Sequence, residues 1–551
     1  MADFKIIDGV CVIPEGTTEI RDNEFRNCEE LISVEIPDSV TEIGGRRDLF
    51  CGEEYVEGAF EGCTGLTNID IPNSVTKIVD GAFKDCTGLT ILRIPDSVTE
   101  IGECAFEGCT GLTSIEIPNS VVEIRDGAFS GCTKIVQILV SANNKKYKSV
   151  DNCCLTKDGS ELCFGCMTSV IPDDVTQIRD FAFADCHGLT SLRIPNSVTE
   201  IGHGAFKGCD RLANLRIPNG VTKIGEQAFK GCTCLTNIEI PNSVTKIGWR
   251  AFEGCSGLTS IEIPNSVTEI GHDAFKGCAR LANLRIPNSV TKIGDDAFKG
   301  CASLTSIKIP SSIMDIGRAF SGCTGFTSLR IPDSVTIIWD GAFSGCTGLK
   351  SIEIPDSVTI IGGMRDLDFM LGRVGVGAFK GCTGLTSINI PNSVTKIGDG
   401  TFEGCIGLTS IEIPNSVIEI GEDAFKGCTQ LSTIVVGKSN QYFTSRDIQG
   451  NECNCIIETQ SNKLISGCWT ATIPDNVTII GESAFERCLG LTSITIPKNI
   501  TSIENKAFSG CAGLASINVD KNNQYYVSQD LQGNECNCIV EIQTKKLVCA
   551  C

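Results

Sequence analysis

The chain has 551 residues, and its 46 basic and 67 acidic side chains give a net charge of −21 with neutral histidines. This acidic balance argues against a nucleic-acid partner, which needs a basic face. Apolar residues make up 41% and charged residues 21%, which is typical of a folded chain rather than a disordered one. The unusual counts are 18 Pro, 25 Phe, 33 Cys and only 3 His.

The first residues carry no visible targeting signal. No basic stretch is followed by an apolar run in Met-Ala-Asp-Phe-Lys-Ile-Ile-Asp-Gly-Val, and no window approaches the roughly 18 consecutive apolar residues of a membrane span. We therefore expect a cytoplasmic protein without a membrane span, with a cell-surface or secreted location as the alternative. An odd number of cysteines fits free thiols better than a complete disulfide framework.

A repeat of 23 residues runs along the chain. Every proline follows an isoleucine, from Pro14 to Pro497, and 23 is the commonest interval between prolines. A phenylalanine recurs 18 times from Phe25 to Phe508, each time with a cysteine three residues later. The unit is Ile-Pro-x-Ser-Val-Thr-x-Ile-Gly-x-x-Ala-Phe-x-Gly-Cys-x-x-Leu-x-x-Ile-x. A fixed period of this length predicts one solenoid of about 18 stacked coils rather than several globular domains.

Each unit predicts short strands and a tight turn. In Leu-Thr-Ser-Ile-Glu-Ile, residues 112–117, Ile115 and Ile117 alternate with polar residues as in a strand, and Pro118 ends it. Val121 and Ile124 predict a second extended segment. Ala128-Phe129 predicts a single helical turn that Gly131 closes.

The segment 263–278, Ile-Pro-Asn-Ser-Val-Thr-Glu-Ile-Gly-His-Asp-Ala-Phe-Lys-Gly-Cys, resembles the BspA-like, treponemal type of leucine-rich repeat. The resemblance covers nearly the whole chain. It implies a right-handed leucine-rich repeat solenoid and a role as an adhesin or protein-binding surface antigen, although a fold does not supply a function.

Other segments interrupt or bound the repeat. Alternation and Gly, Asn and Asp turn signals predict β-hairpin modules at 141–171, 437–473 and 520–551, the last as a C-terminal module or cap, and 1–13 resembles an N-terminal cap. The repeat blocks are then 14–140, 172–436 and 474–519. Insertions at 45–58 and 363–377 share Gly-Gly-x-Arg-Asp-Leu at one repeat phase, and such loops either carry function or are duplicated without a role.

The sequence motifs provide little support for an enzymatic function. His203 and His272 occupy one variable slot of near-copied segments, and no nucleophile elbow, phosphate loop or zinc-protease motif is present. We therefore predict no enzyme, no catalytic residues and no cofactor. The cysteine-rich first module has enough thiols for a zinc site, against the simpler reading of strand packing; they are Cys153, Cys154, Cys163 and Cys166.

The residue between the two isoleucines of Leu-x-x-Ile-x-Ile is expected to face solvent, and it is charged along most of the chain. The central run is predicted as a protein-binding stripe: Arg193, Arg216, Glu239, Glu262, Arg285, Lys308, Arg330 and Glu353. The alternative is a solvated charge ladder that only stabilises the sheet. The favoured function is a non-enzymatic protein-binding scaffold; a surface adhesin and a cysteine-based metal or thiol sensor remain alternatives.

Overall fold

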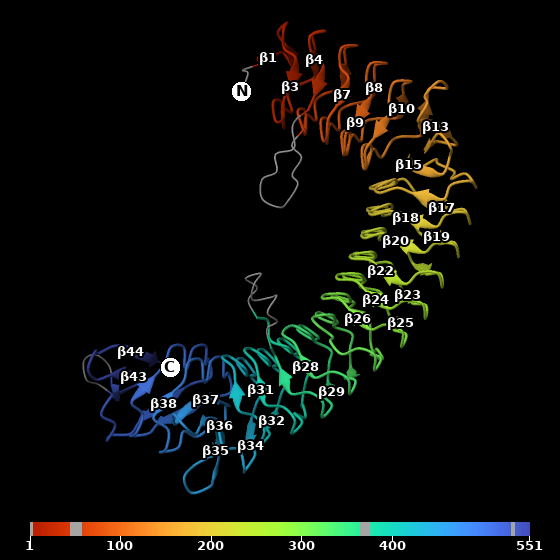
Figure 1. Ribbon diagram of the computed structural model, residues 1–551. Coiled ribbons are helices and arrows are strands. Elements are labelled where there is room, and N and C mark those ends of the chain that lie inside the picture. Colours follow the sequence, from red (N-terminus) through yellow and green to blue (C-terminus); the bar gives the residue numbers. More distant parts are fainter. Residues whose placement is uncertain (1–3, 45–57, 364–374, 530–534, 551) are drawn as a thin grey trace. The chain divides into compact units, whose positions relative to one another are not determined.

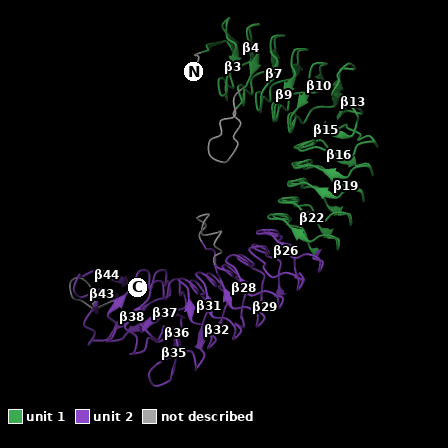
Figure 2. Ribbon diagram, in the orientation of Figure 1, with its two compact units in different colours: residues 1–283 green, residues 284–551 purple. Residues whose placement is uncertain are grey.

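The computed structural model describes residues 4–44, 58–363, 375–529 and 535–550 (Figure 1). They form a β-solenoid of about 21 turns of stacked parallel strands, and none of the described residues is helical. The chain divides into two compact units, residues 1–283 and 284–551 (Figure 2).

Each regular coil gives one strand to each of two parallel rows. The first-row strand β10 (Ser114–Ile117) buries Ile115 and Ile117 and exposes the two residues between and before them, as period two predicts. The second-row strand of the same coil is β11 (Glu123–Ile124). In the next coil, β12 (Gln137–Val140) pairs with β10 in parallel, so that Ile138 lies opposite Ile115. Because the repeat is constant, equivalent side chains of successive coils form columns.

The first row comprises β4 (Ser33–Glu35), β6 (Asn68–Asp70), β8 (Ile91–Arg93), β10, β12, β17 (Ser191–Arg193), β19 (Asn214–Arg216), β21 (Asn237–Glu239) and β23 (Ser260–Glu262), and from residue 283 onward β25 (Asn283–Arg285), β27 (Ser328–Arg330), β29 (Ser351–Glu353), β32 (Ser410–Ile413), β34 (Thr433–Val436), β39 (Ser493–Ile496) and β41 (Ser516–Val519).

The second row comprises β3 (Glu19–Ile20), β5 (Glu42–Ile43), β7 (Lys77–Ile78), β9 (Glu100–Ile101), β11, β16 (Gln177–Ile178), β18 (Glu200–Ile201), β20 (Lys223–Ile224), β22 (Lys246–Ile247), β24 (Glu269–Ile270), β26 (Lys292–Ile293), β28 (Ile337–Ile338), β30 (Ile360–Ile361), β31 (Lys396–Ile397), β33 (Glu419–Ile420), β38 (Ile479–Ile480) and β40 (Ser502–Ile503).

The repeat phenylalanines form a column of stacked rings in the core. Phe60, Phe83 and Phe106 are fully buried. The ring centroids of Phe60 and Phe83 lie 5.1 Å apart, and those of Phe83 and Phe106 lie 5.3 Å apart. A single coil would leave both faces of its ring uncovered. Stability therefore comes from the contact between neighbouring coils, as expected for a repeat protein.

The single helical turn predicted at each Ala-Phe segment is wrong. The segment forms consecutive turns, in which the Cys63 N–H donates to the Phe60 carbonyl at 3.1 Å. The Phe60 N–H, however, donates to the Ala82 carbonyl of the next coil at 2.8 Å. Because this amide bonds between coils, it is not available to propagate a helix. The predicted role of glycine at the end of the segment is confirmed, since Gly131 has a φ of 70°.

Three antiparallel meanders interrupt the coils. The first consists of β13 (Tyr147–Val150), β14 (Cys153–Thr156) and β15 (Glu161–Gly165), and β15 then pairs in parallel with β16. The second, β35 (Phe443–Arg446), β36 (Glu452–Glu458) and β37 (Lys463–Gly467), joins β38 in the same way. The third consists of β42 (Tyr526–Gln529), β43 (Glu535–Glu541) and β44 (Leu547–Ala550). Each meander supplies a turn, which explains why the turns outnumber the 18 repeats.

The chain begins with a hairpin of β1 (Ile6–Ile7) and β2 (Val10–Val12), and β2 pairs in parallel with β4. Of the two insertions, residues 45–57 and 364–374 lie outside the described residues.

Candidate binding surface

The predicted stripe residues are all exposed. Arg193, Arg216, Glu239 and Glu262 each end a first-row strand of the first unit. Arg285, Arg330 and Glu353 have the same position in β25, β27 and β29. Lys308 is exposed as well, but its segment is extended without forming a regular strand.

Two pairs of neighbouring charges in the first unit are of like sign, whereas Asp70 lies opposite Arg93. Arg193 lies opposite Arg216, and Glu239 lies opposite Glu262. Strands in a sheet are about 4.8 Å apart, and like charges directly opposite each other destabilise a sheet.

Few of these side chains are paired. Arg193 contacts Asp173 at 2.7 Å, and Arg330 contacts Glu353 at 3.4 Å, both as exposed pairs of little energetic value. Within the described part of the chain, no carboxylate lies within ion-pair distance of Arg216, Arg285 or Lys308. The positive charge of these three side chains therefore remains available to a partner.

The second row carries a further column of charged side chains, which was not among the predicted site residues. The residue before its isoleucine forms ion pairs between coils: Lys77 with Glu100 at 3.3 Å, Lys246 with Glu269 at 3.1 Å, and Lys396 with Glu419 at 2.7 Å. The signal in the sequence is the alternation of Glu and Lys at x in Thr-x-Ile. Several pairs of the second row therefore form ion pairs between coils, as a solvated charge ladder would, although Glu19 lies opposite Glu42 and Glu100 opposite Glu123 in the same row.

The repeat cysteines form a buried column beside the rings. The Cys63 thiol donates to the Phe25 carbonyl at 3.0 Å, and the Cys86 thiol donates to the Phe60 carbonyl at 3.0 Å. The same contact recurs at Cys255 and Cys405. Burial raises the pKa of Cys63, Cys255 and Cys405 to about 12. These thiols stay protonated at neutral pH, which makes them poor nucleophiles and metal ligands.

The four cysteines of the first module do not converge. Adjacent strand residues point to opposite faces, so Cys154 lies with Cys163 while Cys153 lies with Cys166 and Ser169. Burial raises the pKa of Cys153 to about 12. Among the described residues, no three His, Cys, Asp or Glu side chains are placed to hold a metal ion. In the second module, a hydrogen bond from Cys455 lowers the pKa of Cys453.

Two of the three histidines contact side chains of the neighbouring coil. His187 Nδ1 lies 3.1 Å from Asp210 Oδ1, with both side chains about half exposed. His203 Nε2 lies 3.3 Å from Gln227 Nε2, and its ring packs edge-on against Phe181. In the described ranges, no helix is long and apolar enough to cross a membrane.

Comparison with known proteins identifies the repeat. The BspA type leucine rich repeat region matches six times, at residues 10–48, 53–157, 161–282, 268–364, 367–468 and 456–546. A leucine-rich repeat protein from Bacteroides ovatus is 31% identical, covering 62% of this chain and 83% of that chain, with a TM-score of 0.45. A leucine-rich cell-surface protein from Faecalibacterium prausnitzii is 24% identical, covering 81% and 88%, with a TM-score of 0.34. No curated protein matches. Since the repeat matches span nearly the whole sequence, the chain belongs to the BspA-type leucine-rich repeat family.

Proposed function

We propose that the protein is a non-enzymatic scaffold that binds another protein through the exposed first-row strands. The observation that carries this proposal is the contrast between the two rows. Several charges in the second row pair across coils, whereas the first row places Arg193 opposite Arg216 and Glu239 opposite Glu262. Arg216, Arg285 and Lys308 form no ion pair with any described residue. Unpaired like charges on a sheet cost stability, and a partner of opposite charge recovers that cost on binding.

The site in the second unit is a basic patch formed by Arg285, Lys308 and Arg330. Its partner presents a complementary acidic surface. Charge complementarity of this kind contributes more to the rate of association and to specificity than to raw affinity. The interaction therefore weakens as salt rises.

A surface adhesin is the second candidate. It is supported by the family and by a neighbour described as a cell-surface protein. No comparison favours the cytoplasmic location expected from the first residues. Cell fractionation combined with protease shaving of intact cells tests this candidate: release of fragments supports it, and complete protection of the chain rejects it.

Charge reversal tests the binding surface. The variant Arg285→Glu, Lys308→Glu, Arg330→Glu changes the first row, and Lys223→Glu, Lys246→Glu, Lys396→Glu changes the paired second row by the same total charge. Both proteins are compared with the parent by circular dichroism and thermal unfolding. Each is then used for crosslinking in the source cells, followed by mass spectrometry of the captured proteins.

The proposal expects one or more acidic proteins to be captured by the parent and by the second-row variant and to be lost with the first-row variant. Capture that survives first-row reversal at physiological salt contradicts the proposal. A first-row variant that unfolds while the second-row variant stays folded also contradicts it, because the first-row charges would then be structural.

A further inference from the structure

The first two meanders interrupt the second row of strands in the same way. Strand β11 ends its sheet before the first meander, and β33 ends its sheet before the second. In both places an asparagine anchors the incoming chain. Asn144 donates to the Pro118 and Val121 carbonyls, and Asn440 donates to those of Pro414 and Val417. The two junctions are therefore equivalent position by position.

Large side chains fill the space over the Phe129 ring at the first junction. The Phe164 ring lies 4.7 Å from the Phe129 ring and extends the ring column. Arg125 and Arg179 lie beside it, in ion pairs with Glu100 and Glu161. The space left among these groups is about 10 Å³. A more open polar hollow of about 580 Å³ also lies at this junction, beside Tyr147 and Arg179, and no phenylalanine lines it.

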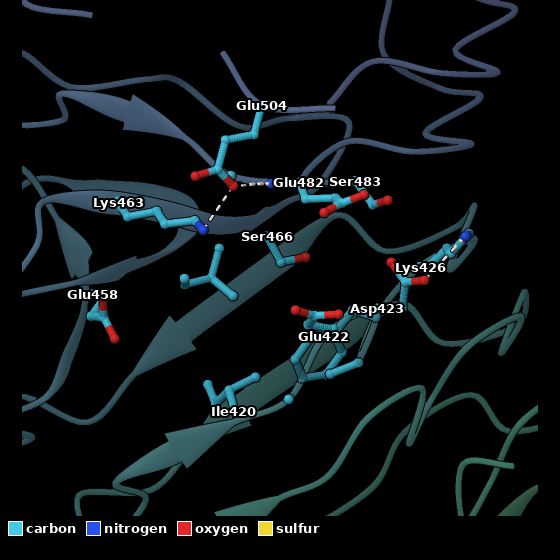
Figure 3. Close-up of a pocket in the computed structure, with 15 residues that line it drawn as sticks. Ile420, Glu422, Asp423, Lys426, Glu458, Lys463, Ser466, Glu482, Ser483 and Glu504 are labelled. Atoms are coloured by element: carbon cyan, nitrogen blue, oxygen red, sulfur yellow. Dashed lines mark hydrogen bonds and ion pairs between the residues drawn. The ribbon is translucent and has the colours of Figure 1, made fainter. Parts of the chain in front are cut away.

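Small residues stand at the equivalent positions of the second junction. Gly421 and Gly481 replace the two arginines, and Ser466 and Ser483 replace Phe164 and Phe181. The result is a cavity of about 240 Å³ whose apolar lining includes Ile420, Phe425 and Ile465 (Figure 3). An engineered cavity of roughly 150 Å³ holds benzene, so this cavity has room for a six-membered ring and a short chain.

At the first and third meanders, a tyrosine hydroxyl accepts a hydrogen bond from the last second-row strand before the meander. The second meander has no such hydroxyl at the equivalent position. The Ile124 N–H donates to the Tyr147 hydroxyl at 3.0 Å, and the Ile503 N–H donates to the Tyr526 hydroxyl at 2.9 Å. The equivalent residue of the second meander is Phe443, which has no hydroxyl to offer Ile420. Ile420 is itself one of the residues that line the cavity.

The rim of the cavity is acidic. Five carboxylates surround it: Glu422, Asp423, Glu458, Glu482 and Glu504. The two lysines present are already neutralised, because Lys463 pairs with Glu504 at 2.7 Å and Lys426 pairs with Asp423 at 3.1 Å and with Glu486 at 3.0 Å. Figure 3 shows Glu422 and Glu482 beside the same hollow as Ser466. The remaining negative charge favours a cation.

We propose that this junction is a binding site for a small aromatic amine. The ring of the ligand takes the place over Phe425 that Phe164 takes over Phe129, and its ammonium group is held by Glu422 and Glu482. The lining combines apolar side chains with charged ones, which suits a ligand that has both an apolar ring and a charged group. This site is separate from the basic patch on the first-row strands.

Titration of the full chain with 2-phenylethylamine tests the proposal, by calorimetry or ligand-observed NMR. The matched ligand is 3-phenylpropanoate, which keeps the ring and reverses the charge. Ser466→Phe introduces the side chain that Phe164 provides at the first junction. Because this ring would occupy the cavity, the variant is expected to weaken amine binding by at least tenfold. Ser439→Phe makes the same change at an exposed position of the same meander and is expected to leave binding unchanged.

A second variant, Glu422→Gln with Glu482→Gln, keeps the shape of the cavity and removes charge. It is expected to weaken binding of the amine at least tenfold. If Ser466→Phe does not fold, this variant alone tests the site. The proposal is overturned if the parent does not bind the amine, if the carboxylate binds as well, or if either the charge variant or a folded Ser466→Phe protein retains full affinity. Reversal of Arg285, Lys308 and Arg330 leaves amine affinity unchanged, which keeps this test independent of the proposed protein-binding function.

Discussion

Alkaline pH is expected to unfold the solenoid through its buried thiols. Burial raises the pKa of Cys346 and Cys405 to about 12 in the folded chain, from 9.0 for an exposed thiol. Above pH 9.0 the unfolded chain loses these protons while the folded chain keeps them, so stability falls as pH rises through the interval to about 12. At about pH 10 each such thiol lowers the free energy of unfolding by about 1.4 kcal/mol relative to neutral pH. The two together give about 3 kcal/mol.

The assay is urea denaturation from about pH 7 to about pH 10 under reducing conditions, in a chain whose Trp249 and Trp469 are replaced by Phe. The remaining Trp339 then reports on the coil that contains Cys346. The double variant Cys346→Ala, Cys405→Ala is less stable at neutral pH, because each thiol donates to a phenylalanine carbonyl at 3.2 Å. Its stability should nevertheless fall less steeply with pH. Cys234→Ala removes an exposed thiol and controls for the loss of a sulfur. An equal slope in the double variant and the parent would refute the reasoning.

Two further predictions concern the core and the junctions. Phe252→Ala removes a fully buried ring stacked at 5.4 Å on its neighbour and should lower the free energy of unfolding by about 3–5 kcal/mol, measured by urea denaturation; a loss below about 1 kcal/mol would contradict the stacked column. Tyr147→Phe removes the hydroxyl that accepts the Ile124 N–H and should cost about 1–3 kcal/mol, whereas the reverse change Phe443→Tyr should stabilise the second junction; thermal unfolding of both variants tests this, and shifts of the same sign would contradict it.

The 23-residue period predicted much of this fold. It placed alternating residues such as Ile115 and Ile117 inside the strands and the phenylalanines in one column, because a constant period stacks equivalent side chains. It did not predict the conformation at Phe60, where a local pattern suggested a helical turn. That amide bonds to Ala82 of the next coil, and a bond between coils leaves no local signal in the sequence.

The exposed stripe was predicted residue by residue, since the alternation assigns each side chain to one face. The sequence by itself therefore determined the repeat, the strand faces and the positions of the charged side chains in the first row. The tertiary structure decided which charges are paired: Lys246 meets Glu269, while Lys308 meets no carboxylate among the described residues. It also decided that Phe164 fills the space over Phe129 at the first junction, whereas a cavity lies beside Phe425 at the second. Arg125 and Phe164 are distant in sequence, and only the fold brings them together. The same holds for Gly421 and Ser466 at the second junction.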